Sequence, residues 1–160
     1  MRFAKSGRAI SILAVAFLVA TASAQSRTHQ HCQAAGGMLL SNLGVAGQAN
    51  TMGTATGDLK GAVSGTIVSS EVVGDNLVFH IQHHWVTDSG DTLFFDQATA
   101  TTTAVVPGLY AVITYPFHIN GGTGKFAGVT GDFNNIGEAD LNTGQLVLRY
   151  SGKLCFADEE

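Results

Sequence analysis

The sequence is poor in charged residues, cysteine and proline, and these shortages narrow the classes of protein to consider. Charged residues make up 12% of the 160 residues, and there are two cysteines, two prolines and one tryptophan. Beyond residue 24 no apolar run reaches the roughly 20 residues that a membrane-spanning helix needs. Basic residues are especially scarce there: 8 − 3 = 5 Lys and Arg stand against 12 Asp and Glu, a formal charge of 5 − 12 = −7. An acidic chain without a basic cluster predicts neither nucleic acid nor a membrane as a partner.

The first 24 residues have the pattern of a secretory signal peptide. Basic residues Arg2, Lys5 and Arg8 precede an apolar run of 14 residues, "AISILAVAFLVATA", and the small-residue triplet "ASA" closes the segment. The run is short for a membrane anchor, which needs roughly 20 residues. We therefore expect cleavage after residue 24 and a mature protein that is secreted or periplasmic.

Two cysteines, Cys32 and Cys155, lie near the two ends of the remaining chain. In an exported protein such a pair predicts a disulfide, because oxidising compartments preserve one. The bridge would close a loop of 155 − 32 + 1 = 124 residues, which the chain-entropy model values at roughly 4–5 kcal/mol. We expect it to fasten a first strand to a last strand.

Apolar residues alternate with polar ones from residue 36 onward, and helical periodicity is almost absent. Period-two runs separated by Gly, Asn, Asp and Pro turns predict an antiparallel meander. We expect an all-β fold, a single antiparallel closed barrel of about eight strands over residues 36–157, preceded by a mobile arm over 25–35. The expected strands lie roughly at 38–49, 61–72, 76–87, 91–98, 100–106, 109–119, 125–138 and 145–155.

The glycine-rich stretch "GGTGKFAGVTGDF", residues 121–133, raises the question of a phosphate-binding loop. Such a loop needs a Gly-Lys-Ser/Thr sequence and a following helix, whereas here Lys125 is followed by Phe126 and by residues that do not propagate a helix. Glycines within strands permit sharp coiling and close approach of bulky side chains. We therefore expect a turn at 121–124, and points of strand curvature at Gly128 and Gly131.

The stretch "GGTGKFAGVTG" resembles the glycine signature of dirigent proteins and of allene oxide cyclase-like barrels. "HHWVTDSGDTLFFDQATATTT", "PGLYAV" and "TGDLKGAVSGTI" are similar to segments of bacterial secreted members of the cyclase-like group, so the resemblance covers most of residues 55–155. It implies an eight-stranded barrel with an apolar cavity, no cofactor, and a homo-oligomer as one option, since the plant enzymes are often trimeric.

The catalytic residues of these families do not carry over. Plant allene oxide cyclases place a glutamate and asparagines on the opening strand, where this chain has Asn42 but no carboxylate. Dirigent proteins carry an arginine just before the last glycine of the signature, and Thr130 stands at that position here. The resemblance therefore indicates the fold more than the chemistry.

The inner face of the predicted strands supplies the candidate site. His83 lies between Ile81 and Trp85 on the apolar face of "NLVFHIQHHWVTD", and Tyr115 lies between apolar residues of "LYAVITYPFHIN". Buried groups of this kind have shifted pKa values and can transfer protons, but they can equally be hydrogen-bonded core residues. We take His83 and Tyr115 as catalytic candidates, with the following as ligand-binding candidates: Phe79, Ile81, Trp85 and Phe117.

A metal site is not expected from the six histidines. His80 and His84 share a strand face but lie about 13 Å apart along it, at ~3.3 Å per residue. The two cannot bind one ion by themselves, so a site would need His118 or an acidic residue from a neighbouring strand. The faces that carry these histidines are predicted to point outward into solvent.

Two functions fit the sequence. The first is a secreted allene oxide cyclase-like barrel that binds a small, largely apolar molecule and could act as a cofactor-free cyclase or isomerase. The alternative is a non-catalytic structural or interaction protein with a filled core, since small barrels are often packed solid. A cavity below about 100 Å³ would favour the alternative, because ligand pockets usually measure ~300–1,000 Å³.

Overall fold

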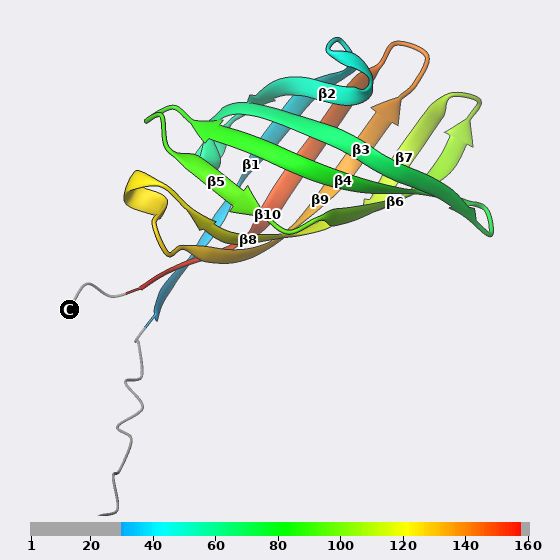
Figure 1. Cartoon of the computed structure of the whole chain (residues 1–160). Helices are drawn as coiled ribbons and strands as arrows, with labels where there is room; N and C mark the ends of the chain where they lie inside the picture. Colours follow the sequence, from blue (N-terminus) through cyan, green and yellow to red (C-terminus); the bar gives the residue numbers. More distant parts are fainter. Residues whose placement is uncertain (1–29, 158–160) are drawn as a thin grey trace, which may run out of the picture.

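The computed structural model describes residues 30–157, so the expected signal peptide and residues 25–29 lie outside the described part of the chain. Strands account for most of that part (Figure 1). In chain order the elements are β1 (Gln30–Gly44), β2 (Gly47–Ala55), the 3-10 helix η1 (Gly57–Leu59), β3 (Gly61–Val73), β4 (Asn76–Thr87), β5 (Thr92–Phe95), β6 (Ala98–Val106), β7 (Leu109–Thr114), β8 (Pro116–Gly122), the 3-10 helix η2 (Gly124–Phe126), β9 (Thr130–Asp140) and β10 (Gln145–Ala157).

The strands close into a barrel. All the paired strands are antiparallel, and β10 pairs with both β1 and β9. β4 pairs with β6 along its first half and with β5 near its end, while β9 pairs with β8 along its first half and with β7 near its end. β5 and β6 thus share one position in the ring, as do β7 and β8, so the ten strands fill eight positions. The predicted closed antiparallel barrel is confirmed, and closure removes the edges of an open sheet.

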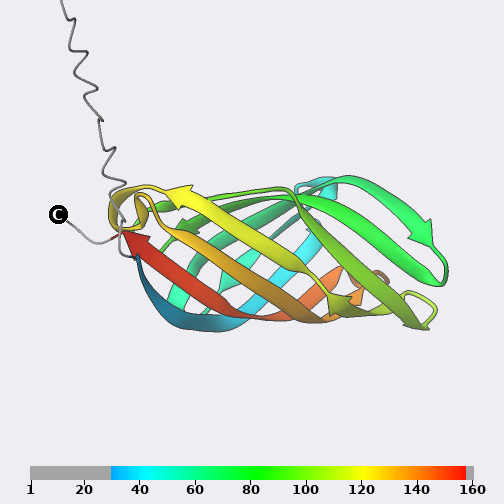
Figure 2. The same ribbon diagram turned by 90° about the horizontal axis from the view of Figure 1, so that it is seen from below.

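The two ends of the barrel carry different connections (Figures 1 and 2). The hairpins β1–β2, β3–β4, β6–β7 and β9–β10 lie at one end, which we call the turn end. Both 3-10 helices, the β4–β5 turn and the two described chain ends lie at the other, which we call the terminal end. Figure 2 shows the β3–β4 hairpin and the chain ends at opposite extremes.

Aromatic side chains fill the half of the barrel nearer the terminal end. The rings of Phe117 and Phe133 stack with centroids 5.1 Å apart, and Trp85 meets Tyr150 edge-on at 5.6 Å. We call the rings that contact one another here the aromatic layer: Trp85, Phe95, Phe117, Phe133 and Tyr150. The indole Nε1 of Trp85 donates a hydrogen bond to the carbonyl of Leu59 at 2.7 Å, and this bond holds η1 against the aromatic layer. Other large residues that are almost fully buried complete the filling: Leu93, Ile119, Phe126, Val129 and Leu154.

The disulfide predicted between Cys32 and Cys155 is confirmed. The two residues face each other directly in the β1–β10 register, with Cα atoms 4.0 Å apart. The bond joins the first and last strands beside the terminal end, across a separation of 123 residues. A loop of this length corresponds to roughly 4–5 kcal/mol of stabilisation in the chain-entropy model.

The strand boundaries differ from the prediction at the N-terminal side. Residues 30–35, expected to belong to a mobile arm, are the start of β1 and pair with residues 152–157 of β10. Inter-strand hydrogen bonds and the disulfide hold this segment, which shows no alternation of apolar residues. The strand expected at 38–49 is divided between β1 and β2, and most of β2 was not predicted.

The strand predicted over 109–119 is two strands with a break at Tyr115. Val112 and Tyr115 are 5% and 6% exposed, whereas Ile113 between them is 49% exposed, so the alternation changes phase at the break. The side chain of Asn134 on β9 spans the gap, because its Oδ1 accepts a hydrogen bond from the Tyr115 backbone N at 2.8 Å. The predicted inner face therefore holds for the β8 half and is wrong for the β7 half.

The glycine-rich stretch shapes the barrel. It ends β8, forms the turn with η2 and then enters β9, where a phosphate loop would need a helix. Gly131 lies inside β9, and a Cβ there would sit 2.6 Å from the carbonyl oxygen of Lys153, so only glycine allows this approach. Gly128, expected within a strand, lies instead in the preceding turn with a φ of +69°.

Candidate functional site

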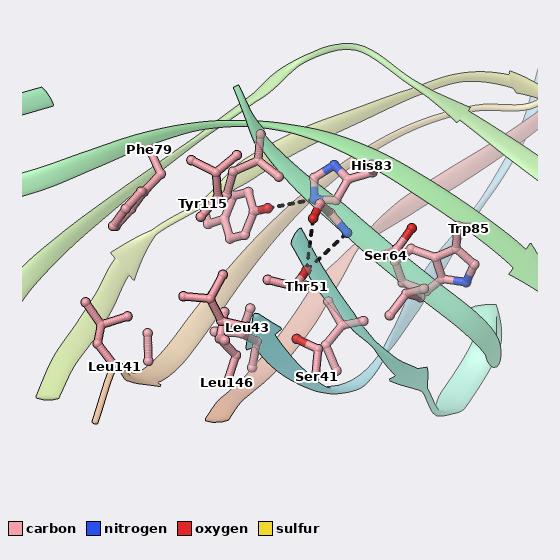
Figure 3. A pocket seen from close by; sticks show the side chains of 17 residues that line it. Ser41, Leu43, Thr51, Ser64, Phe79, His83, Trp85, Tyr115, Leu141 and Leu146 are labelled. Atoms are coloured by element: carbon pink, nitrogen blue, oxygen red, sulfur yellow. Dashed lines mark hydrogen bonds between the residues drawn. The ribbon is translucent and has the colours of Figure 1, made fainter. Parts of the chain in front are cut away.

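An apolar cavity occupies the half of the barrel nearer the turn end (Figure 3). Its volume is about 90 Å³. Its wall includes Leu43 beside the β1–β2 turn and Leu141 beside the β9–β10 turn, and Leu141 is 39% exposed, so the cavity opens toward the turn end. The other lining residues are Leu39, Ser41, Thr51, Val63, Ser64, Gly65, Ile67, Phe79, Ile81, His83, Trp85, Tyr115, Ala139, Leu146 and Leu148.

β4 contributes four alternating residues to this wall, as its period-two pattern predicts. Phe79, Ile81, His83 and Trp85 point inward from one face of the strand and follow the cavity from the turn end to the aromatic layer. Three of the four ligand-binding candidates therefore lie at the cavity. Phe117 does not line it. This residue is 4% exposed and packs against His83, with the two ring centroids 5.8 Å apart.

His83 and Tyr115 form a polar pair at the inner end of the cavity (Figure 3). The Nε2 atom of His83 lies 2.7 Å from the Tyr115 hydroxyl oxygen. The imidazole also rests on the aromatic layer, with its centroid 5.4 Å from that of Phe95. The break between β7 and β8 makes this pairing possible, because the change of phase at that point turns Tyr115 inward.

Burial favours the neutral form of both groups. It lowers the pKa of His83 from its ordinary 6.5 to about 4, and the nearby His84 has a smaller effect in the same direction. Burial also raises the pKa of the Tyr115 hydroxyl well above its ordinary value. At neutral pH the imidazole is therefore a weak base and the phenol a weak acid. The pair suits hydrogen bonding better than proton transfer, for which the pKa should lie near the working pH.

The cavity offers few other polar groups. Among residues 30–157, its lining includes no Asp, Glu, Lys or Arg. The hydroxyl of Thr51 is already engaged, because it accepts a hydrogen bond from the Gly65 backbone N at 3.0 Å. Ser41, on the inner face of β1, adds a hydroxyl to the wall. A bound molecule would therefore meet an apolar surface with its main polar contact at the inner end.

Sequence reasoning missed the residues that complete the wall from β1, β3, β9 and β10. Ala139 lies between Glu138 and Asp140, so its inward direction was available from the pattern, whereas Leu39 is flanked by the apolar residues Met38 and Leu40 and gave no such signal. The pattern did not show how far along the barrel axis each of these residues lies. Strand tilt sets that depth, and tilt depends on the whole ring.

A buried asparagine was also missed. Asn135 is fully buried on the inner face of β9, opposite Tyr150 in the β9–β10 register. Neither its amide nitrogen nor its amide oxygen has a hydrogen-bond partner among residues 30–157. Its position two residues after Phe133 placed it on the inner face, but asparagine is usually found in turns. It does not line the cavity.

A second hollow of about 360 Å³ lies in the outer wall, where β5–β6 and β7–β8 are interrupted. It is larger than the inner cavity, but several of its polar groups are already paired. His118 Nδ1 lies 2.7 Å from Asp132 Oδ1, and Asn120 donates to Asp96 Oδ1 at 2.6 Å. The Asp132 side chain is 89% exposed, so water competes for its contacts. We regard this groove as solvated surface.

Neither a metal-binding cluster nor a membrane-spanning helix is found among residues 30–157. In the part of the chain that the structure describes, no three His, Cys, Asp or Glu side chains gather closely enough to hold a metal ion. The same residues contain no helix of the length and apolar character required to cross a membrane.

Comparison with known proteins adds no relative. No family model matches the chain, and no curated protein or solved structure is significantly similar to it. The resemblance to allene oxide cyclase-like and dirigent barrels therefore stays a prediction that rests on the glycine signature and the neighbouring segments.

Proposed function

We propose that this protein is an exported β-barrel that binds a small, largely apolar molecule in the cavity at the turn end. The carrying observation is the His83–Tyr115 pair, in which buried Tyr115 contacts half-buried His83 at the inner end of an apolar cavity that opens to the surface. Polar groups cost free energy on burial unless they are fully hydrogen-bonded. A barrel with a purely structural role would be more stable with apolar residues at these two positions.

Export is supported by two features. The pattern of residues 1–24 is typical of a signal peptide. The Cys32–Cys155 disulfide persists in oxidising compartments and is rare where thiols are kept reduced.

Binding has more support than catalysis. A cofactor-free cyclase or isomerase of the allene oxide cyclase-like kind would need a group that gives or takes up a proton near neutral pH. Because the pKa of His83 is about 4, its imidazole rarely takes up a proton at neutral pH. Burial makes the Tyr115 hydroxyl a weaker acid than an ordinary tyrosine. The pair can orient a ligand and polarise it by a hydrogen bond, which is a smaller contribution than proton transfer.

The filled structural barrel is the second candidate, and the cavity volume favours it. About 90 Å³ is below the ~300–1,000 Å³ of most ligand pockets and below the ~150 Å³ cavity that binds benzene in an engineered protein. A ligand would have to extend through the open end or widen the turn end. The two candidates therefore differ in whether anything enters the barrel.

Titration followed by tryptophan fluorescence separates them. Trp85 is the only tryptophan in the chain and it lines the cavity, so its emission reports on occupancy. Ketones, alkenes and alcohols of about six to ten carbons should each give a saturable change if the cavity binds ligand. A flat response across the whole panel would reject binding and favour the filled barrel.

A matched pair of variants tests the location. Ser41→Leu places an apolar side chain in the cavity and should abolish the response, because Ser41 lines the wall. Ser151→Leu makes the same change at an exposed position of β10 and should leave it intact. A response that survives in Ser41→Leu would place the ligand elsewhere.

A further inference from the structure

We infer that the Tyr115 hydroxyl donates a hydrogen bond to the ligand, and that its acceptor is a neutral oxygen of an otherwise apolar molecule, such as a ketone, ester or ether. This inference rests on the proposed function and specifies the ligand class of the same site. It follows from the hydrogen-bond geometry of His83 and from the absence of charged side chains around the cavity.

The first step concerns the proton on the imidazole. Nδ1 of His83 is buried and has no hydrogen-bond partner among residues 30–157, and the ring packs against Phe95 and Phe117. A neutral imidazole carries its proton on one nitrogen and leaves a lone pair on the other. Among buried backbone groups, N–H donors without a partner are rarer than under-satisfied C=O acceptors, and we apply the same preference to the imidazole ring. We therefore assign the proton to Nε2 and the lone pair to Nδ1.

The second step concerns the hydroxyl of Tyr115. With its proton on Nε2, His83 donates to the Tyr115 oxygen across the 2.7 Å contact. The phenol hydrogen is then free, and no other residue of the described chain hydrogen-bonds the hydroxyl. Because Tyr115 lines the cavity, a ligand there can supply the missing acceptor. An unpartnered buried donor is costly, so pairing it favours binding.

The third step concerns the charge of the ligand. The lining residues within 30–157 include no Lys or Arg, so a carboxylate at the inner end would lose its hydration without gaining a cation. They include no Asp or Glu either, so an ammonium group would fare no better. A neutral acceptor avoids this cost and still receives the Tyr115 hydrogen bond.

Nitrogen NMR of the wild-type protein tests the first step without any ligand. The ¹⁵N shifts and the ring-proton correlations of a histidine distinguish its two neutral tautomers. The His83 signals are assigned by their loss in His83→Gln. We expect the Nε2–H tautomer at pH 7. The Nδ1–H tautomer would mean that Tyr115 already donates to His83, and it would overturn the inference.

Three probes of nearly equal shape test the ligand class: 2-heptanone, 2-methyl-1-heptene and hexanoate. The alkene replaces the carbonyl oxygen by CH₂, and hexanoate replaces the methyl group by a charged oxygen. We expect 2-heptanone to bind about tenfold more tightly than the alkene, and hexanoate to bind least. Tenfold corresponds to ~1.4 kcal/mol, within the range for one hydrogen bond.

Tyr115→Phe removes the donor and keeps the ring. It should abolish the roughly tenfold preference for 2-heptanone over the alkene, mainly by weakening ketone binding. Tyr110→Phe is the matched control, because Tyr110 lies on β7 and does not line the cavity. The control should keep the wild-type preference, and thermal unfolding should show that both variants are folded at the temperature of the titration.

The outcomes separate this inference from the function on which it rests. Equal binding of ketone and alkene to the wild type, or an unchanged preference in Tyr115→Phe, would overturn the donor role and leave apolar binding intact. Preferred binding of hexanoate would overturn the neutral class. If neither the three probes nor the wider panel binds, both the inference and the proposed function fail.

Discussion

The two halves of this barrel are built from the same eight strand positions but are filled differently. The terminal half holds Trp85, Phe95, Phe117, Phe133 and Tyr150 in ring-to-ring contact. The turn half is lined mainly by Leu, Ile, Val, Ala and Ser, with Phe79 as its one phenylalanine among the lining residues described. Aromatic rings fill the first half, whereas the smaller side chains of the second leave a cavity of about 90 Å³.

The difference is consistent with the proposed function, in which one half of the barrel is rigid and the other half binds the ligand. The packed half also carries the disulfide and both 3-10 helices, so the features that restrain the chain are gathered at the terminal end. The turn half has the hairpins, several with exposed valines: Val45, Val72, Val73, Val105 and Val106. Binding sites are commonly held by a rigid scaffold and open through its connecting segments. The His83–Tyr115 pair lies at the boundary between the halves.

The largest expected effect is on folding stability, in a comparison of Phe117→Ala with Phe79→Ala. Phe117 is 4% exposed within the aromatic layer, so its truncation should cost about 3–5 kcal/mol. Phe79 is only partly buried and borders the cavity, so it has fewer contacts to lose and should cost about 1–2 kcal/mol. Urea unfolding of both variants measures the two costs. Equal losses would show that the turn half is packed as tightly as the terminal half.

The next effect is a pH dependence of stability that arises where the halves meet. The pKa of His83 is lower in the folded protein, about 4, than in the unfolded chain, about 6.5. Between these values the unfolded state binds the additional proton, so the free energy of unfolding falls as the pH falls from 6.5 to 4 and then levels off. Over this interval the free energy of unfolding should fall by roughly 3 kcal/mol because of His83.

Urea unfolding at a series of pH values, with His83→Gln as the control, isolates this contribution. Other groups contribute to both proteins, so the difference between the two curves reports His83. The wild type should lose more stability than the variant between pH 6.5 and 4. Parallel curves would show that the imidazole is hydrated in the folded state and that the inner end of the cavity is wet.

The fold itself could be predicted largely from local signals. Period-two alternation and turn residues placed β3, β4 and β10 within about two residues of their bounds and indicated closure. A single pair of cysteines in a chain with a signal-peptide pattern predicted the Cys32–Cys155 bond. These features depend on neighbours in sequence or on a single pair of residues, which a pattern can reveal.

The candidate site depended on contacts that no local pattern contains. The break at Tyr115 is held by Asn134 from the next ring position, so a single strand over 109–119 was the natural expectation. Phe117 and Phe79 both point inward, and only the tilt of the strands decides that one fills the layer and the other borders the cavity. The inward direction was thus predictable for β4 and β8, while depth was not.

The smallest expected effect tests whether the cavity is real empty space. Ala139 lines the cavity, and Ala98 is buried on the inner face of β6 outside it. Ala139→Leu adds an isopropyl group where space exists, so it should leave stability within about 1 kcal/mol of the wild type, with stabilisation as the expected sign. Ala98→Leu makes the same change in a packed environment and should cost about 1–3 kcal/mol, because overpacking forces strained side chains. Thermal unfolding of the two variants measures the contrast. If Ala139→Leu is destabilised as much as Ala98→Leu, the turn half has no empty space, and both the distinction between a filled half and a hollow half and the proposed binding site fail.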